Sequence, residues 1–192
     1  AARVLFCFVL NALVYLNNDY IDVQIDLQSA DKDATKSRFL SDNRKAALHA
    51  QLILLGLLIA AALVYDYGLL VPLIAGGGIC WWYSAQLKRR PFWDIVAMTI
   101  WGVTMPMCGS PVSHPIGWAM ALQLGLYSAV FETIQVMRDA DADADEGVRT
   151  TAVLLGKQRT LRLAQALMFL VTLFALLFML PWAAAISSVA LI

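Results

Sequence analysis

The segment "VLFCFVLNALVYLNNDYIDVQID", residues 4–26, passes from an apolar run into a regular series of acidic residues. Its second half carries Asn18, Asp19, Asp22 and Asp26. On an α-helix, where each residue turns by about 100°, these four side chains share one face that extends over about 12 Å. A carboxylate that faced lipid would cost several kcal/mol. The segment therefore predicts a membrane-spanning helix whose acidic end faces a cavity or the interior of a helix bundle.

The composition of the whole chain agrees with a membrane protein. Hydrophobic residues make up 60% of the 192 residues and charged residues only 15%, and the mean hydropathy is +0.68. These values exclude an ordinary soluble domain. The formal net charge is zero, so we expect no nucleic-acid partner. The partner that the composition does predict is the lipid bilayer.

Six apolar segments are expected to cross the membrane as helices. They cover residues 1–20, 46–65, 69–84, 92–108, 116–137 and 161–180, and a seventh begins at residue 181. Nothing in the sequence suggests a soluble domain, so residues 1–192 are expected to form one all-α domain, a polytopic transmembrane bundle. Because the chain begins and ends within apolar segments, we expect it to be a fragment of a longer protein.

The basic residues predict how this bundle is oriented. Every Lys and Arg except Arg3 lies in or beside three connectors, residues 27–45, 85–91 and 138–160. With one membrane crossing between successive loops, these three connectors share one side. The loops on the opposite side, residues 66–68 and 109–115, contain no Lys or Arg. Since cytoplasmic loops carry the excess of positive charge, we expect the charged connectors, with the acidic clusters beside them, to be cytoplasmic.

A second acidic cluster, "RDADADADEG", covers residues 138–147 at the end of another expected span. On a helix, Asp139 and Asp143 lie about 40° apart, and Asp141 and Asp145 form a second such pair on roughly the opposite side. Only one pair can face inward, and periodicity alone does not choose between them. Glu132 lies seven residues before Asp139, so it could line the same face deeper in the membrane.

The chemistry of these residues indicates a site for Mg²⁺ and phosphate. Carboxylate and amide oxygens that converge would repel one another, and a bound hard cation relieves that repulsion. Mg²⁺ prefers oxygen ligands and shares its coordination shell with substrate phosphates. Lys88, in the segment "YSAQLKRRP" (residues 83–91), and Arg38 are the cations expected to bind the outward oxygens of a diphosphate.

Taken together, three segments resemble the motifs of the UbiA-type intramembrane prenyltransferase superfamily. "NDYIDVQID", residues 18–26, is similar to its first NDxxDxxxD motif. "YSAQLKRRP" resembles its YS…LK connector, and "RDADADADEGVRTTAVLLG", residues 138–156, resembles its second aspartate motif. The three segments occur in the order that the family has, and the resemblance spans about residues 10–160.

The resemblance implies a nine-helix bundle around a central cavity, from which terminal helices are missing here. Aligning Gly147 with the glycine of the family's second motif selects Asp139 and Asp143 as the inward pair. Two Mg²⁺ ions would then bridge a diphosphate, the first held by Asn18, Asp19, Asp22 and Asp26 and the second by Asp139 and Asp143. Arg38, Tyr83 and Lys88 would bind the diphosphate, and the catalytic residues would be Asp22, Asp26, Asp139 and Asp143.

The activity that the resemblance implies is Mg²⁺-dependent transfer of an isoprenyl group in isoprenoid biosynthesis. An isoprenyl diphosphate would ionise to an allylic carbocation, which a lipophilic acceptor, expected to be aromatic, would attack within the membrane. A terpene cyclase of the same superfamily would carry the same motifs and is the first alternative. A divalent-cation transporter is a further alternative. It would need acids along a path across the membrane, whereas the opposite side offers only Asp66.

Overall fold

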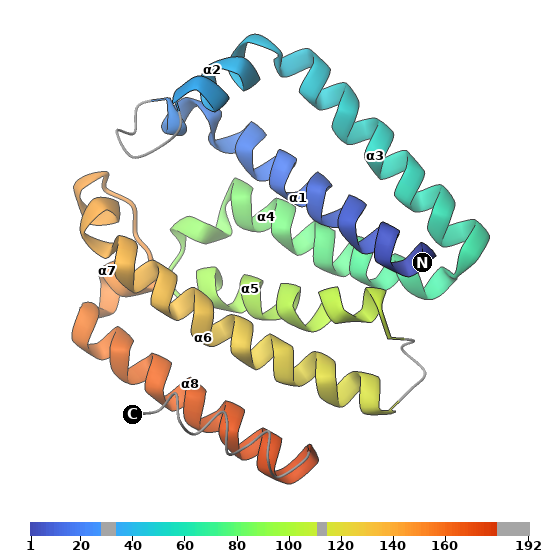
Figure 1. The fold of residues 1–192 in the computed structure, drawn as a ribbon. Helices are drawn as coiled ribbons and strands as arrows, with labels where there is room; N and C mark the ends of the chain where they lie inside the picture. The colour runs from blue at the N-terminus through green and yellow to red at the C-terminus, as the bar shows by residue number, and fades with distance from the viewer. Residues whose placement is uncertain (28–33, 111–114, 180–192) are drawn as a thin grey trace.

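The computed structural model describes residues 1–27, 34–110 and 115–179, and its elements there are all helical (Figure 1). The longer ones are α1 (Ala2–Asp26), α3 (Arg44–Tyr65), α5 (Trp93–Thr104), α6 (Pro115–Asp145) and α8 (Lys157–Phe178). The shorter ones are α2 (Ala34–Asp42), η1 (Tyr67–Leu69), η2 (Pro72–Gly77), α4 (Gly78–Ala85), η3 (Leu87–Arg89), η4 (Met105–Cys108) and α7 (Thr151–Leu155).

Each of the six expected spans coincides with helical structure, which confirms the all-α polytopic fold. Four stretches of the described residues are long and apolar enough to cross a membrane: α1, α3, Tyr67–Ala85 and α8. The third of these runs through η1, η2 and α4. Its middle part, η2, is a π-helix that begins at Pro72, a residue without a backbone N–H donor. Helices α5 and α6, which coincide with two other expected spans, are not among these four stretches. Helix α5 has only 12 residues, and α6 carries the buried polar residues Gln123, Glu132 and Thr133. The seventh apolar segment lies outside the described residues.

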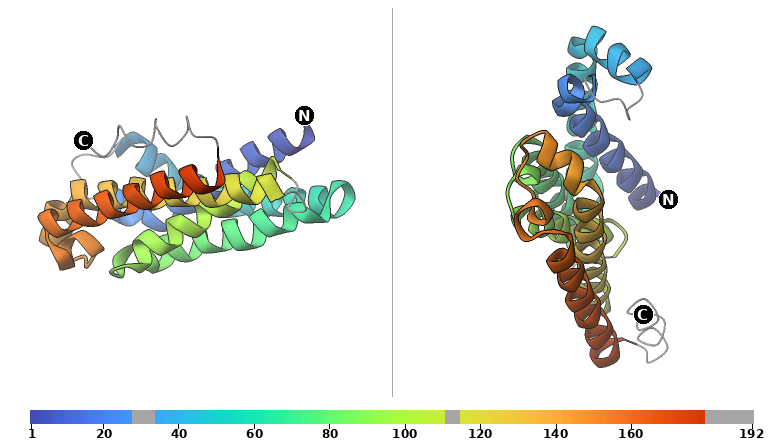
Figure 2. Two further views of the ribbon diagram at one scale, coloured as in Figure 1. Left: turned by 90° about the horizontal axis from the view of Figure 1, so that it is seen from below. Right: turned by 90° about the vertical axis from the view of Figure 1, so that its left-hand side faces the viewer.

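The long helices, together with α4, form a continuous row of neighbours (Figure 1). Contacts run from α3 to α1, α4, α5, α6 and α8 in that order. Two views show α2 and α7 at the same end of the bundle, opposite the end at which the chain begins (Figures 1 and 2). The connectors that carry the basic residues therefore meet at one end of the bundle.

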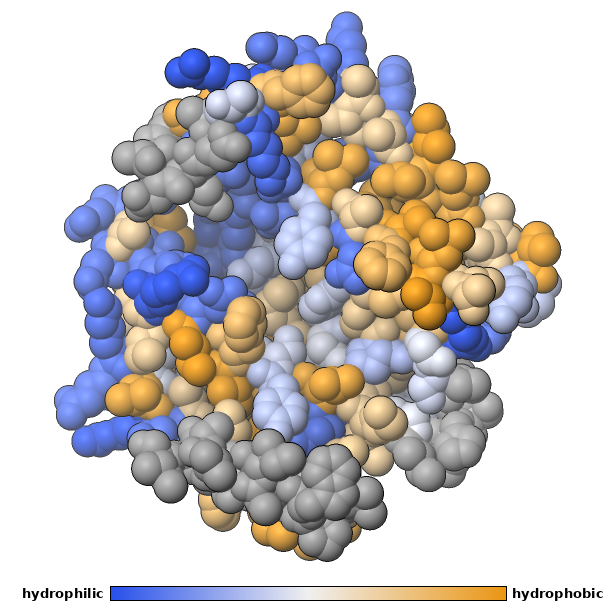
Figure 3. Space-filling model, in the orientation of Figure 1, coloured by the Kyte–Doolittle hydropathy of each residue, from blue (hydrophilic) through white to orange (hydrophobic). Residues whose placement is uncertain are grey.

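The surface of the bundle matches a lipid environment over most of its length. Large apolar side chains such as Phe8, Val64 and Leu177 are strongly exposed, whereas polar Gln123, Glu132 and Thr133 are buried. Figure 3 shows hydrophilic residues gathered at the end where α2 and α7 lie, and hydrophobic residues spread over the part of this face that is farther from that end. Such an arrangement, with apolar groups outside and polar groups inside, is expected of an integral membrane protein.

Helices α5 and α6 approach each other closely because small residues line their contact. A Cβ atom added at Gly102 would overlap the Cβ of Ser128, and one added at Gly125 would overlap the Val103 Cγ2. The Ser128 hydroxyl donates a hydrogen bond to the carbonyl oxygen of Met98 (2.7 Å). In a membrane, where apolar burial adds little between helices, such close packing and interhelical hydrogen bonds hold helices together.

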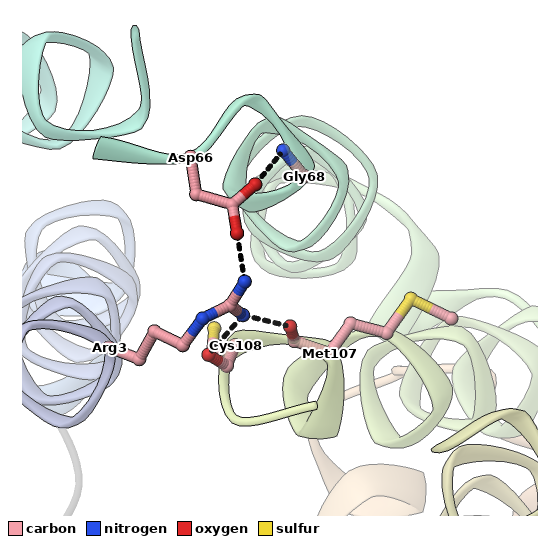
Figure 4. A network of polar contacts seen from close by, with 5 residues as sticks. All are labelled: Arg3, Asp66, Gly68, Met107 and Cys108. Carbon is pink, nitrogen blue, oxygen red and sulfur yellow. Dashed lines mark hydrogen bonds and ion pairs between the residues drawn. The ribbon is translucent and has the colours of Figure 1, made fainter. Parts of the chain in front are cut away.

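The end of the bundle opposite α2 and α7 is held by one polar network (Figure 4). The Arg3 guanidinium forms an ion pair with Asp66 and donates a hydrogen bond to the carbonyl oxygen of Cys108 (3.1 Å). Asp66 also accepts the backbone N–H of Gly68 (2.8 Å). The network joins the start of α1 to the α3–η1 turn and to η4. It also pairs with a carboxylate the only Lys or Arg of the sequence that lies neither in nor beside the three connectors.

The close contact of α5 and α6 makes Gly102 sensitive to a single added methyl group. Gly102→Ala should lower the free energy of unfolding in detergent by about 1–3 kcal/mol, because the new Cβ overlaps Ser128 and lies against the backbone of α6. Gly56→Ala is the matched control, since no heavy atom lies within 4 Å of the Cβ position there. Thermal unfolding of both variants is the measurement, and equal midpoints would contradict this account of the contact.

Candidate active site

A cavity of about 890 Å³ brings the two acidic clusters together. It is lined by the last turns of α1, by α4 and η3, by the second half of α6 and by the loop that follows α6. Its polar lining residues are Asn18, Asp22, Asp26, Tyr83, Lys88, Arg89, Glu132, Gln135, Arg138, Asp139, Asp143, Glu146 and Thr150. Segments more than 100 residues apart in the chain thus contribute carboxylates to one hollow.

Three of the four residues expected from the first cluster line this cavity, namely Asn18, Asp22 and Asp26. Asp22 is only 7% exposed and forms an ion pair with Lys88 of η3. Asn18 accepts a hydrogen bond from the Ser84 hydroxyl (2.9 Å). Asp19 is not among the lining residues. It pairs with Lys36 of α2 (2.7 Å), because it lies about 100° around the helix from Asn18 and so turns toward α2.

In the second cluster, the pair that lines the cavity is Asp139 and Asp143. Asp141 is exposed and pairs with Lys157 (2.6 Å), and Asp145 is also exposed. The helix ends at Asp145, and Gly147, two residues farther on, has a φ of 72°, in the left-handed region that favours glycine. The choice that periodicity left open is therefore made by the packing of α6 against its neighbours.

The residues expected to bind a diphosphate are divided by the structure. Lys88 lines the cavity, and so does its neighbour Arg89, which we did not expect from the sequence. Tyr83 also lines it, but its hydroxyl donates a hydrogen bond to Glu132 Oε1 (2.8 Å). Arg38 is exposed on α2 and is not among the lining residues.

The lining of the cavity is rich in negative charge. Six carboxylates, those of Asp22, Asp26, Glu132, Asp139, Asp143 and Glu146, line it with the three cations Lys88, Arg89 and Arg138. Beyond the expected membrane span, burial raises the pKa of Asp143 above its ordinary value. A hydrogen bond with Thr150 opposes that shift, and the charges of Asp139 and Glu146 add to it. Such an excess of carboxylates favours the binding of a cation.

The donor set fits Mg²⁺ shared with a substrate. Within residues 1–27, 34–110 and 115–179, no three His, Cys, Asp or Glu side chains already converge as a complete metal site. Mg²⁺ is commonly held by one or two carboxylates and completes its shell with water and substrate phosphates, so pairs of carboxylates are sufficient. Carboxylate pairs from α1 and from α6, on the walls of one cavity, provide that arrangement.

A buried contact connects the loop after the second cluster to the start of α5. Asp94 is fully buried (0% exposed) and accepts both the backbone N–H (2.7 Å) and the hydroxyl of Thr151. The Thr151 hydroxyl oxygen in turn accepts the backbone N–H of Phe92 (2.6 Å). Phe92 has a φ of 68°, which is uncommon for a bulky residue. The contact fixes Thr150, the adjacent residue, beside Asp143 on the cavity wall.

Sequence reasoning did not identify the roles of Asp94 and Thr150. The acidic residue in an otherwise apolar span is the signal that could have drawn attention to Asp94, because an ionisable residue at that depth needs a partner. Its partner could not be inferred, since Thr151 lies 57 residues away in the chain.

A second cavity, of about 590 Å³, lies between α1, α3, η2 and α4. Its lining is mostly apolar and includes Leu13, Leu55, Leu73 and Trp81. Helix α1 presents Asn17 and Ile21 to this cavity and Asn18 and Asp22 to the acidic one. One helix therefore separates an apolar hollow, suited to hydrocarbon, from a charged one.

Comparisons with known proteins give a family match and several relatives. The sequence profile of the UbiA prenyltransferase family matches residues 1–192. A 4-hydroxybenzoate octaprenyltransferase of Shewanella sp. (strain ANA-3) is 25% identical over 166 residues, which cover 81% of this chain and 57% of the relative. A second one, from Xanthomonas oryzae pv. oryzae (strain PXO99A), is 29% identical over 163 residues, covering 78% of this chain and 54% of the relative.

A third relative carries a different name. A digeranylgeranylglyceryl phosphate synthase of Saccharolobus solfataricus is 24% identical over 161 residues, which cover 81% of this chain and 56% of the relative. The chain thus spans about half the length of the curated relatives it matches. No solved structure matches the chain significantly.

The contact between Asp94 and Thr151 is expected to be important for stability. Asp94→Ala removes the acceptor of both buried donors of Thr151, and each buried donor left without an acceptor costs about 1–3 kcal/mol. Thermal unfolding in detergent should show a clear loss of stability, with a smaller loss in Asp94→Asn, which retains one acceptor oxygen. Asp145→Ala, an exposed position, serves as the control and should unfold like the unchanged protein. Equal stability of Asp94→Ala and the control would show that the contact is dispensable.

Proposed function

The chain belongs to the UbiA prenyltransferase family, and on this premise we propose that it transfers an isoprenyl group from a prenyl diphosphate to a lipophilic aromatic acceptor within the membrane. The observation that carries the proposal is the single cavity shared by the carboxylates of α1 and α6 and by Lys88 and Arg89. A diphosphate needs cations, and the residues that could hold them come from both walls of this cavity.

The proposed binding residues are those that the cavity brings together. Asn18, Asp22 and Asp26 would hold one Mg²⁺ ion, and Asp139 and Asp143 the other. When bound, the two ions would neutralise the diphosphate and make it a better leaving group. Lys88 and Arg89 would donate hydrogen bonds to the remaining diphosphate oxygens. We leave Asp19 and Arg38 out of the site, because neither lines the cavity.

The proposed reaction begins with ionisation. The allylic C–O bond breaks and its electron pair stays on the diphosphate. The negative charge that develops there would be stabilised by the side chains of Lys88 and Arg89. The acceptor then forms a bond to C1 of the allylic carbocation. Water has to be excluded, because it would capture that cation.

Two further observations support details of the proposal. The relatives named above include 4-hydroxybenzoate octaprenyltransferases, which favours an aromatic acceptor, and none of those named is a cyclase. The basic connectors meet at the end of the bundle that contains the cavity, which favours its cytoplasmic placement by the distribution of positive charge.

The function can be tested in sealed inside-out vesicles that contain the full-length protein. Given octaprenyl diphosphate, 4-hydroxybenzoate and Mg²⁺, they should form a prenylated aromatic product that mass spectrometry detects. EDTA, which does not cross the membrane, should stop the reaction in these vesicles and spare it in right-side-out vesicles loaded with substrates and Mg²⁺. Consumption of the diphosphate without any acceptor, to a cyclic hydrocarbon, would instead identify a cyclase. The assay is repeated with a panel of shorter prenyl diphosphates and other phenols. The proposal would be contradicted if none of these substrate pairs gave a prenylated product.

The site can be tested with four aspartates of one helix. Asp139→Asn and Asp143→Asn should each lower kcat by about 100-fold or more, because each removes a charge from a proposed metal ligand. Asp141→Asn and Asp145→Asn change the same residue type on the opposite side of α6 and should leave turnover nearly unchanged. All four variants should fold, as judged by thermal unfolding in detergent. If kcat fell equally in the cavity pair and in the Asp141 and Asp145 variants, the chemistry would not take place in the cavity.

A further inference from the structure

Glu132 is a buried carboxylate that the proposed metal and diphosphate sites do not use. It lies on α6, about 10 Å along the helix from Asp139 on the side of the membrane interior. Its side chain is 7% exposed and lines the acidic cavity. It is held there by Tyr83 of α4, whose hydroxyl donates a hydrogen bond of 2.8 Å to Oε1. A carboxylate at this depth is costly and calls for a functional explanation.

The surroundings of Glu132 differ from those of Asp22 and Asp139, which also line the cavity. Asp22 is paired with Lys88, and Asp139 with Arg138 (2.7 Å). The donor to Glu132, in contrast, is the neutral phenol of Tyr83. The titratable groups whose charges act on the Tyr83–Glu132 pair are Asp22 on α1, Asp94 on α5 and Asp139 on α6. A carboxylate held by a neutral donor among acids is suited to accepting a proton rather than to binding an anion.

The proposed reaction requires such a proton acceptor. When the aromatic carbon or hydroxyl of an acceptor bonds to C1 of the allylic cation, it must release one proton to regain a neutral, stable product. The electron pair of the C–H or O–H bond returns to the acceptor, and the proton needs a base within reach. Lys88, Arg89 and Arg138 are unsuitable as bases because they are cationic, and the aspartates near the mouth are those proposed to hold Mg²⁺.

We propose that Glu132 is the catalytic base that takes this proton from the prenyl acceptor, and that Tyr83 positions its carboxylate. This inference rests on the proposed transfer function. The C1–O bond breaks and its electron pair stays on the diphosphate oxygen. The new bond then forms between C1 and the acceptor, and the proton of the acceptor moves to Glu132. It leaves to water through the polar mouth of the cavity when the products depart. Tyr83, which the resemblance assigned to the diphosphate, thereby has its hydroxyl engaged by the base.

The placement of Glu132 also accounts for how ionisation and proton removal would occur at separate places in one cavity. Ionisation takes place where Asp139, Asp143 and Lys88 gather, and proton removal takes place about two helical turns farther along α6. An acceptor that lies between them can face C1 on one side and Glu132 on the other. The acceptor site would then be bounded by Tyr83, Glu132 and Gln135, which come from α4 and α6.

The test compares Glu132→Gln with the unchanged full-length protein, using octaprenyl diphosphate and 4-hydroxybenzoate, or whichever pair the panel above shows to react. Glutamine keeps an oxygen that can accept the Tyr83 hydrogen bond but is not a base. The kcat of transfer should fall by about 100-fold or more, with little change in the KM of either substrate. Release of diphosphate should fall less than transfer does, because ionisation does not need Glu132, and the part of the cation that fails to react with the acceptor should appear as the prenyl alcohol after capture by water.

An isotope effect separates a chemical role from a structural one. With the acceptor deuterated at its reacting carbon, or with D₂O for a reacting hydroxyl, Glu132→Gln should show a larger kinetic isotope effect than the unchanged protein, since proton removal has become slow. Glu132→Asp should recover part of the rate, and Tyr83→Phe should lower kcat less than Glu132→Gln does. Asp145→Asn, outside the cavity, is the control for handling and expression.

Several results would overturn the inference. An unchanged kcat in Glu132→Gln, a loss confined to KM, or an equal loss of diphosphate release would each exclude a catalytic base at this position. These outcomes differ from failure of the proposed function, in which the unchanged protein itself would transfer no prenyl group to any acceptor. Transfer by the unchanged protein with normal turnover by Glu132→Gln would therefore reject this inference alone.

Discussion

The structure depends on the cost of placing carboxylates in a helix bundle that lipid surrounds. An ionised side chain at membrane depth has to face the bundle interior and find counter-charges or hydrogen bonds there. Helix α1 meets this constraint by turning Asp22 toward Lys88, and α6 by turning Asp139 and Asp143 toward the same cavity. Because both helices direct their acids inward, the carboxylates converge, and their convergence creates a place for cations. The same constraint that fixes how these helices rotate thus also produces the candidate site.

The short stretch from Lys88 to Asp94 connects the two halves of the cavity. At one end Lys88 pairs with Asp22 of α1. At the other end the Phe92 backbone and the Asp94 carboxylate bind Thr151, next to the loop that carries Thr150 and follows the second acidic cluster. A segment of seven residues therefore contacts both walls. The unusual φ of Phe92 is accounted for by this double attachment, since strained backbone persists where its surroundings fix it. The opposite end of the bundle is held separately, by Arg3, Asp66 and the carbonyl groups of η4 (Figure 4).

The cavity offers several chemical environments to one substrate pair. Carboxylates and cations lie together at the ends of α1 and α6, while farther along α6 a carboxylate is held by a phenol. On the other face of α1 lies a hollow of apolar side chains. An amphipathic substrate with a charged head and a hydrocarbon tail needs both kinds of surroundings close together. The arrangement is consistent with the UbiA family, to which the chain belongs, and under the proposed function it separates the acids that would bind metal from the one that would accept a proton.

The sequence by itself determined the helices, the membrane class, the family and the two acidic clusters, because apolar length and helical periodicity are local properties of the chain. It also placed Asn18, Asp22 and Asp26 on one face, since 3.6 residues per turn suffices for that. Only the tertiary structure decided that Asp19 turns to Lys36, that Arg38 stays outside, that Tyr83 binds Glu132 and that Asp94 holds Thr151. Each of these depends on which remote segment packs against a helix, and no local pattern carries that information. The choice of Asp139 and Asp143 over Asp141 and Asp145 is intermediate: periodicity reduced it to two pairs, the family resemblance favoured one, and the packing of α6 set which pair faces the cavity.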